Sequence, residues 1–284
     1  MNRKESINKY EEYLILKNYR PKTRFSYTYA LGRFFDYCQS IGRSQFSLQD
    51  YARSYLVYRF GEGKSWHTVN VDYSAISGFC RYVLGQEWDY NMVPRPRGER
   101  RLPTVLSSNQ METLLNRTMN VKHRLLLMLL YTSGVRSGEL LSLQLSDLLL
   151  EREQIKVTQG KGAKDRIVSI PEATVKWIKH YLGKYEPRRY LIEGMYVGRK
   201  YSESSLKKVI DQSVKRAGIK TKVSAHTFRY TYATHQIESG TDIATLKDQL
   251  GHSRISTTMQ YIQLCQIQPR KINHPIKNLN IKRL

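Results

Sequence analysis

The sequence predicts a mainly α-helical protein of two domains, with a small β-sheet in the second domain. Three observations support this fold class. The length of 284 residues suits two ordinary domains with cores that need neither disulfides nor metal. Apolar residues recur at helical spacing along most of the chain, whereas one segment near the middle alternates like a strand. A basic segment rich in proline separates the first hundred residues from the rest.

The first 93 residues predict a four-helix domain. Apolar side chains recur at helical spacing, and Pro21 suits the first turn of a long aromatic-rich helix because that turn needs no proline N–H. The four helices are expected at residues 7–16, 21–38, 48–59 and 68–84.

A linker is expected at residues 94–106. Its core, PRPRGERRLP, has three prolines and a glycine that break any periodic pattern, and four arginines against one glutamate. A solvated charge run is one interpretation. Between two domains of a strongly basic chain, contact with a phosphate backbone is the favoured one. The expected DNA-contacting residues are Arg95, Arg97, Arg100 and Arg101.

The second domain is expected at residues 107–268. Ser107 or Ser108 can cap its first helix, with Glu112 in the first turn, and a strongly apolar helix over 123–132 should stop at Gly134. Residues 154–170 carry β-branched residues on both sides of a glycine-containing turn, which predicts a β-hairpin. Later helices are expected at residues 171–185, 203–217, 225–239, 242–250 and 255–264. The basic tail, 269–284, is either a disordered end or an arm that docks on a neighbouring subunit.

The charge balance predicts a polyanionic partner, because 47 Lys and Arg oppose 24 Asp and Glu, a formal net charge of +23. A membrane is not expected, since the longest apolar run has seven residues, 125–131, and the amino terminus lacks an apolar signal segment. Three widely spaced cysteines without a C-x-x-C pair indicate reduced thiols in a cytoplasmic protein and no structural zinc. Nucleic acid is therefore the expected partner.

Two stretches in the first half of the second domain place cations where a phosphate could bind. In YTSGVRSGELLSL, Arg136 precedes a helix whose amino terminus would add attraction for anions, but pairing with Glu139 at i, i+3 explains it equally well. In GKGAKDR, Lys161 lies between two glycines at the hairpin turn, where a mobile loop could bring it to a substrate oxygen. Basic hairpin tips are also common solvated turns.

Two further stretches lie near the carboxyl end. In SAHTFRYTYATH, His226 and Arg229 are one helical turn apart, which suits binding and proton transfer at a phosphate, although a lone helical histidine is more often structural. In LGHSRISTTMQYI, Gly251 ends a helix, His252 follows in the loop, and Tyr261 comes nine residues later. A helical tyrosine is usually a core or rim residue.

Together these stretches supply cations, histidines and a tyrosine in a fixed order: Arg136, Lys161, His226, Arg229, His252, Tyr261. This ordered set resembles the tyrosine recombinase (phage integrase) family, and the resemblance covers nearly the whole chain. The plan is similar to compact Xer-like and integron-integrase-like members. The resemblance implies an amino-terminal helical domain that binds the DNA core site and an α+β catalytic domain.

The resemblance also implies a role for each residue of the set. Arg136 and Arg229 match the arginines that clamp the scissile phosphate, and Lys161 matches the general acid for the departing 5′ oxygen. His226 matches the position for proton transfer and His252 the one that hydrogen-bonds the phosphate. Tyr261 matches the nucleophile, and Glu139 an acidic supporting residue. Tyr230 departs from the family pattern, which usually has histidine there.

The implied activity is site-specific recombination through a covalent 3′-phosphotyrosyl intermediate, with neither metal nor ATP. A phenol has a reference pKa of about 10, so the cations must favour attack and stabilise the charge that builds on phosphorus. The implied partners are double-stranded DNA with inverted-repeat core sites and other copies of the chain, two per site and four in the synapse. Two alternatives remain open at this point: a helix-turn-helix regulator and a type IB topoisomerase.

Overall fold

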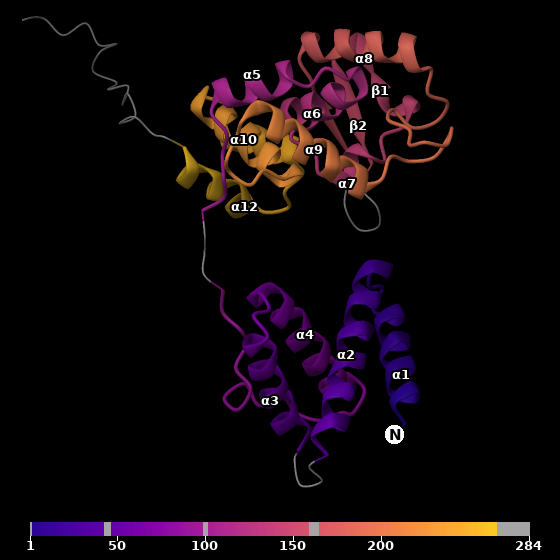
Figure 1. Ribbon diagram of the computed structural model, residues 1–284, viewed down its shortest axis with the longest axis vertical. Helices are drawn as coiled ribbons and strands as arrows, with labels where there is room; N and C mark the ends of the chain where they lie inside the picture. Colours follow the sequence, from indigo (N-terminus) through magenta and orange to yellow (C-terminus); the bar gives the residue numbers. More distant parts are fainter. Residues whose placement is uncertain (1, 43–46, 99–101, 159–164, 266–284) are drawn as a thin grey trace, which may run out of the picture. The chain divides into compact units, whose positions relative to one another are not determined.

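The computed structural model describes residues 2–42, 47–98, 102–158 and 165–265. The chain divides into two compact units, Met1–Arg101 and Leu102–Leu284. Both units are mostly helical, and a small sheet lies in the second, so the predicted fold class is confirmed (Figure 1). Within the described residues, none of the helices is long and apolar enough to cross a membrane.

The first unit contains the four predicted helices. They are α1 (Arg3–Leu16), α2 (Pro21–Ile41), α3 (Leu48–Gly61) and α4 (Trp66–Tyr82). Local residues fix where they begin: Pro21 occupies the first turn of α2, and Ser47 forms a reciprocal capping box with Asp50 at the start of α3. Asp72 on α4 is fully buried and accepts hydrogen bonds from Arg33 on α2 and Arg59 on α3, at 2.8 and 3.0 Å. This carboxylate therefore joins three helices of the unit.

The expected linker packs against the first unit at its beginning and against the second unit at its end. Nε of Arg95 donates to Oδ1 of Asn70 on α4 at 2.9 Å, and its guanidinium lies over the ring of Tyr73. At the other end, Leu106 is buried in the core of the second unit, where its amide donates to the hydroxyl of Thr231. Arg97 is exposed. Arg100 and Arg101 lie outside the described residues.

The second unit has a leucine-rich core inside a layer of helices. Its helices are α5 (Ser108–Asn116), α6 (Val121–Ser133), α7 (Ser137–Leu140), α8 (Glu172–Tyr185), α9 (Glu203–Ala217), α10 (Ala225–Glu238), α11 (Ile243–Leu250) and α12 (Ile255–Met259), with three 3-10 helices, η1 (Leu145–Asp147), η2 (Leu150–Arg152) and η3 (Gln260–Leu264). The apolar helix α6 contributes five fully buried leucines and ends at Gly134, as predicted.

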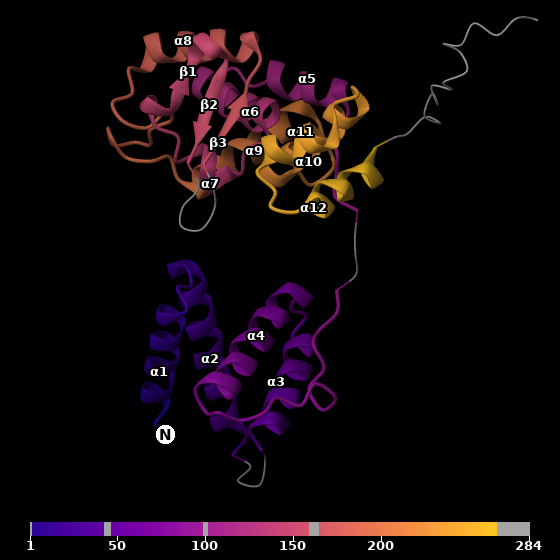
Figure 2. The ribbon, with the colours of Figure 1, turned by 180° about the vertical axis from the view of Figure 1, so that it is seen from behind.

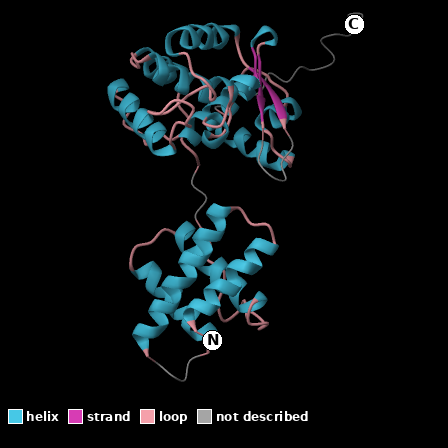
Figure 3. Cartoon of the chain, turned by 90° about the vertical axis from the view of Figure 1, so that its right-hand side faces the viewer, coloured by secondary structure: helices cyan, strands magenta, loops and turns pink. Residues whose placement is uncertain are grey.

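The sheet is antiparallel and has the strand order β1-β2-β3 (Figure 2). The predicted hairpin is confirmed as β2 (Gln154–Val157) and β3 (Arg166–Ser169), in which Ile155 pairs with Val168 and Val157 with Arg166. A third strand, β1 (Leu148–Leu149), was not predicted, because two residues are too short to show an alternating pattern. The sheet is small beside the surrounding helices (Figure 3).

Two local predictions were wrong. Ser107 caps α5, but Gln110 closes the capping box, so Glu112 lies beyond the first turn. The helix expected at 255–264 changes after Met259 into the 3-10 helix η3, which contains Tyr261. Short helices often tighten to i, i+3 bonding at their carboxyl ends, and a run of β-branched Ile and Thr residues weakens the α-helical alternative. The tail at 269–284 lies outside the described residues.

Candidate active site

Arg229 lies at the centre of the candidate site, on α10. Ser224 caps this helix in a reciprocal box with Thr227, which places Arg229 in its second turn. The residue is buried, with 4% of its surface exposed. Nη1 donates to the carbonyl of Gly134 at 2.6 Å, and Nη2 donates to the carbonyl of Leu250 at 2.7 Å. These carbonyls lie at the carboxyl ends of α6 and α11, so one side chain caps two helices.

Burial of this cation has an electrostatic cost. Burial, and next the positive charge of Arg136, lower the pKa of Arg229, while the phenol of Tyr261 raises it through charge and a hydrogen bond. The two arginines therefore repel each other across the site in the free protein. A phosphate diester between them would relieve that repulsion, because each of its non-bridging oxygens can accept from a guanidinium.

Gly134 allows this arrangement, and its replacement should be costly. It ends α6 with a φ of +60°, and a Cβ there would overlap the ring of Tyr232 and crowd Leu250. We expect Gly134→Ala to lower the free energy of unfolding by about 2–4 kcal/mol, through the left-handed backbone and the displaced ring. Chemical unfolding measures this. Gly183→Ala, at an open and exposed position inside α8, is the matched control and should be neutral or stabilising.

His252 connects Arg229 to the segment that carries the tyrosine. Its Nε2 accepts from Nη2 of Arg229 at 2.8 Å, and its Nδ1 lies 2.9 Å from the hydroxyl of Thr258. A guanidinium only donates, so the neutral ring must carry its proton on Nδ1 and donate it to Thr258. Burial, followed by the charges of Arg229, Arg136 and Arg166, lowers the pKa of His252 to about 4. The imidazole is therefore neutral at physiological pH.

Tyr261 packs directly against this pair. The residue is 5% exposed and belongs to a small apolar cluster with Tyr232 and Ala233 on α10 and with Leu246 and Leu250 on α11. Its ring is stacked on that of His252, with centroids 5.9 Å apart and planes 12° apart. Tyr261 is therefore a core residue, as is usual for a helical tyrosine, and it also lies beside the cationic residues, as the resemblance implies.

Arg136 and Glu139 form a second cluster at the start of α7. Nη1 of Arg136 donates to Oε1 of Glu139 at 2.8 Å, and the Arg136 amide donates to Oε2. The structure thus contains the predicted i, i+3 pair, yet Arg136 stays 40% exposed and keeps donors for a ligand. The predicted helix does begin directly after Arg136, but α7 has only four residues, so its dipole is small.

Arg166 completes this cluster. It makes two hydrogen bonds to the Glu139 carboxylate, at 2.7 and 3.2 Å, and its Nε donates to the carbonyl of Gln249 at the end of α11. Burial alone would raise the pKa of Glu139. The bonds from Arg166 and Arg136 outweigh it and hold that pKa at about 2. Glu139 is therefore an ionised bridge between Arg166 on the hairpin and Arg136.

Loss of the Glu139 carboxylate should lower the free energy of unfolding. We expect Glu139→Gln to cost about 3 kcal/mol at pH 7, because it leaves Arg166, which is 9% exposed, without its anionic partner. The depressed pKa means that the stabilisation is present above about pH 4.5 and is lost as the pH falls towards 2. Melting curves at pH 7 and pH 3 test this. The wild type should lose more stability than the variant, and parallel losses would contradict the assignment.

The remaining expected residues do not contact Arg229 or His252 through any hydrogen bond described above. His226 is exposed at the start of α10, and its ring centroid is 6.5 Å from that of Tyr230. The ring centroid of Tyr230 lies 5.6 Å from that of Tyr261. Lys161 lies outside the described residues. The structure thus brings together Arg229, His252 and Tyr261, with Arg136 and Glu139 beside them.

Sequence reasoning missed two residues of this arrangement. Arg166 is the last residue of the GKGAKDR stretch. Its spacing from Lys161 gave no indication that it pairs with Glu139, which lies 27 residues earlier. Thr258 is buried three residues before Tyr261, a spacing that places both on one helical face. That spacing was the only available signal for Thr258.

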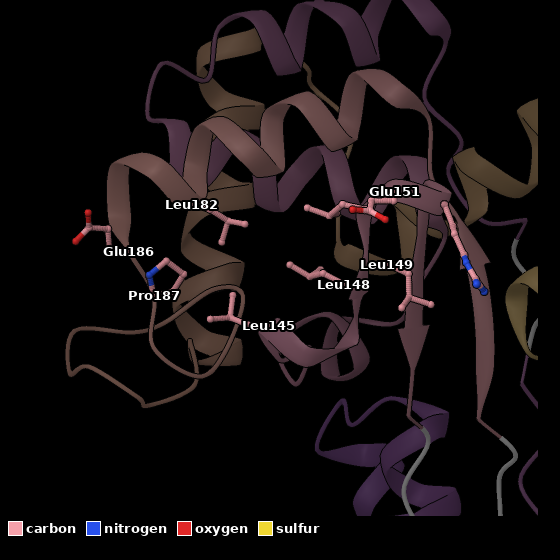
Figure 4. A pocket seen from close by; sticks show the side chains of 9 residues that line it. Leu145, Leu148, Leu149, Glu151, Leu182, Glu186 and Pro187 are labelled. Atoms are coloured by element: carbon pink, nitrogen blue, oxygen red, sulfur yellow. The ribbon is translucent and has the colours of Figure 1, made fainter.

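A surface pocket elsewhere in the second unit is lined by other residues. It has a volume of about 650 Å³ and lies between the end of α8 and the segment that contains β1. Leu182, Glu186 and Pro187 border it on one side and Leu148 and Leu149 on the other, with Leu145 below Leu182 (Figure 4). None of the expected catalytic residues that the structure describes lines it.

The gathered arginines, the neutral histidine and the adjoining tyrosine offer the charge and the hydrogen-bond donors that a phosphate diester would need. The phage integrase family profile matches residues 104–266, and the N-terminal SAM-like domain of phage integrases matches residues 7–90. The first match alone covers more than half of the chain, which therefore belongs to the phage integrase family.

Named relatives agree with this membership. The tyrosine recombinase XerA of Thermococcus onnurineus is 32% identical over 272 residues, which cover 94% of this chain and 93% of the relative. The tyrosine recombinase XerD of Oceanobacillus iheyensis is 34% identical, over 70% and 72% of the two chains. The crystal structure of the XerH site-specific recombinase bound to its difH substrate is similar, with a TM-score of 0.70 and 25% identity over 84% and 75%. The chain is thus a tyrosine recombinase and acts in site-specific DNA recombination.

Proposed function

We propose that the chain cuts and rejoins DNA through a 3′-phosphotyrosyl link to Tyr261. One observation carries this proposal: Arg229, His252 and Tyr261 come from separate segments and form one connected group. The oxygen of Tyr261 would attack phosphorus, so that an O–P bond to the protein forms as the bond from phosphorus to the 5′ oxygen breaks. Arg136 and Arg229 would hold the non-bridging oxygens and stabilise the charge that builds there.

Two protons move in this step, one from the phenol and one to the departing 5′ oxygen, and each needs a side chain that accepts or donates it. We assign the phenolic proton to His226, at the exposed start of α10, and the proton for the 5′ oxygen to Lys161. His252 would hydrogen-bond the phosphate, and Glu139 would hold Arg136 in place through the bonds described above. The phosphotyrosyl bond keeps the energy of the broken diester, so a 5′ hydroxyl of another strand can reverse the step.

The net charge of +23 supports double-stranded DNA as the substrate. We assign binding of the core site to a domain at residues 1–93, strand transfer to residues 107–268, and phosphate-backbone contact to Arg95, Arg97, Arg100 and Arg101. We infer inverted-repeat sites that each hold two copies of the chain, with four copies in the synapse, and we place the reaction in the cytoplasm with the DNA. The basic residues 269–284 would dock on a neighbouring copy.

The test uses two DNA duplexes that carry a candidate inverted repeat from DNA beside the gene, one of them nicked near the cleavage position. A recombinase should leave a covalent protein–DNA band on a denaturing gel and exchange strands between the two duplexes. Relaxation of supercoiled DNA without exchange would indicate a topoisomerase. Binding without any covalent band would indicate a regulator and would overturn the proposal.

A further inference from the structure

We propose that Thr258 is a positioning residue for strand cleavage, holding His252 between the phosphate-binding arginine and the nucleophile. This inference rests on the proposed function for its consequence, although its structural part does not. Thr258 is fully buried on α12, and its hydroxyl lies 2.9 Å from Nδ1 of His252. The opposite nitrogen of the same ring meets Arg229.

The geometry leaves the imidazole little freedom. One edge is held by Thr258, the other edge by Arg229, and one face is covered by the ring of Tyr261. Thr258 and Tyr261 are three residues apart on a continuous helical segment, so both point towards the interior. The hydroxyl therefore fixes the position of the His252 ring relative to the ring of Tyr261.

A hydroxyl also suits the change that phosphate binding requires. In the free protein Nε2 of His252 accepts from Arg229, whereas a hydrogen bond to a phosphate oxygen needs a proton on Nε2. The neutral ring can meet both demands by moving its proton from Nδ1 to Nε2, with no net gain of protons. Thr258 can accept from Nδ1–H in the first state and donate to bare Nδ1 in the second. A valine methyl can do neither.

The expected result separates the hydroxyl from the shape of the side chain. Thr258→Val should slow single-turnover cleavage of a nicked duplex about tenfold, the factor that one lost hydrogen bond gives in a rate, with DNA affinity unchanged. Thr258→Ser should restore the rate. Thr257→Val, one residue earlier at an exposed position, is the matched control and should cleave like the wild type.

A second measurement needs no DNA and so distinguishes failure of this inference from failure of the proposed function. Nitrogen–proton spectra should show the Nδ1–H proton of His252 hydrogen-bonded in the wild type and in Thr258→Ser. That signal should be lost in Thr258→Val and in Thr258→Ala, which serves if the valine variant does not fold. Its persistence in the variants without the hydroxyl, or equal rates for the serine and valine variants, would overturn the role of Thr258. Absence of cleavage by the wild type would overturn only the proposed function.

Discussion

Tyr261→Phe should form no covalent complex with DNA and should still bind it. The phenyl ring fills the same space in the apolar cluster and keeps the stack against His252, so the fold should survive. Only the hydroxyl is removed, and with it the atom that would attack phosphorus. We expect the covalent band on a nicked duplex to fall below detection, while the Kd for the same duplex changes by less than about threefold, or roughly 0.7 kcal/mol.

Tyr230→Phe is the matched control for this prediction. Its ring centroid lies 5.6 Å from that of Tyr261 and the residue is half-buried, so this variant removes a tyrosine hydroxyl from the neighbouring side chain. This variant should still form the covalent band. A band that persists in Tyr261→Phe but disappears in Tyr230→Phe would move the nucleophile to the neighbouring tyrosine.

Arg229→Lys should lose both activity and stability. A lysine keeps the charge, but its ammonium cannot span the carbonyls of Gly134 and Leu250 and also meet His252, as the planar guanidinium does. We expect cleavage to fall by about 10²–10³, the usual effect of losing a donor to the transition-state charge. The free energy of unfolding should fall by about 2–4 kcal/mol, because buried acceptors lose a charged donor.

Arg136→Lys separates these two effects. Arg136 should also be needed for cleavage, but it is 40% exposed, and without its bond Glu139 still keeps Arg166 as a partner. Its replacement should cost less than about 1 kcal/mol of stability. Urea unfolding of the two variants alongside single-turnover cleavage tests the distinction. Equal loss of stability in both variants would contradict the capping role of Arg229.

The first unit was predictable because its signals are local. Pro21, Ser47 and Ser65 stand directly at the starts of the helices they set, and Gly42 ends α2 with a left-handed backbone. The second unit was predictable to the same extent for α9 and for the hairpin, where helical and alternating periods are clear. The change to a 3-10 helix around Tyr261 was not, since five residues carry no period that separates the two helix types.

The site was only partly predictable for a different reason. Its members could be named from order and resemblance, but their contacts join distant segments. Arg229 meets Gly134 across 95 residues, and Arg166 meets Glu139 across 27. No local pattern encodes such a pairing, which depends on how α6, α10 and α11 pack. The structure therefore adds what the motifs lack: Arg229 is both a phosphate ligand candidate and the cap of two helices.

The central claim is that Tyr261 carries the DNA during strand transfer. Mass spectrometry of the covalent complex, after digestion of the protein and DNA, tests it most directly. The account predicts a nucleotide phosphate on the tyrosine of the peptide that spans residues 255–270, and on that tyrosine alone among the 21 in the chain. A phosphate on Tyr230 or on any other residue would contradict it.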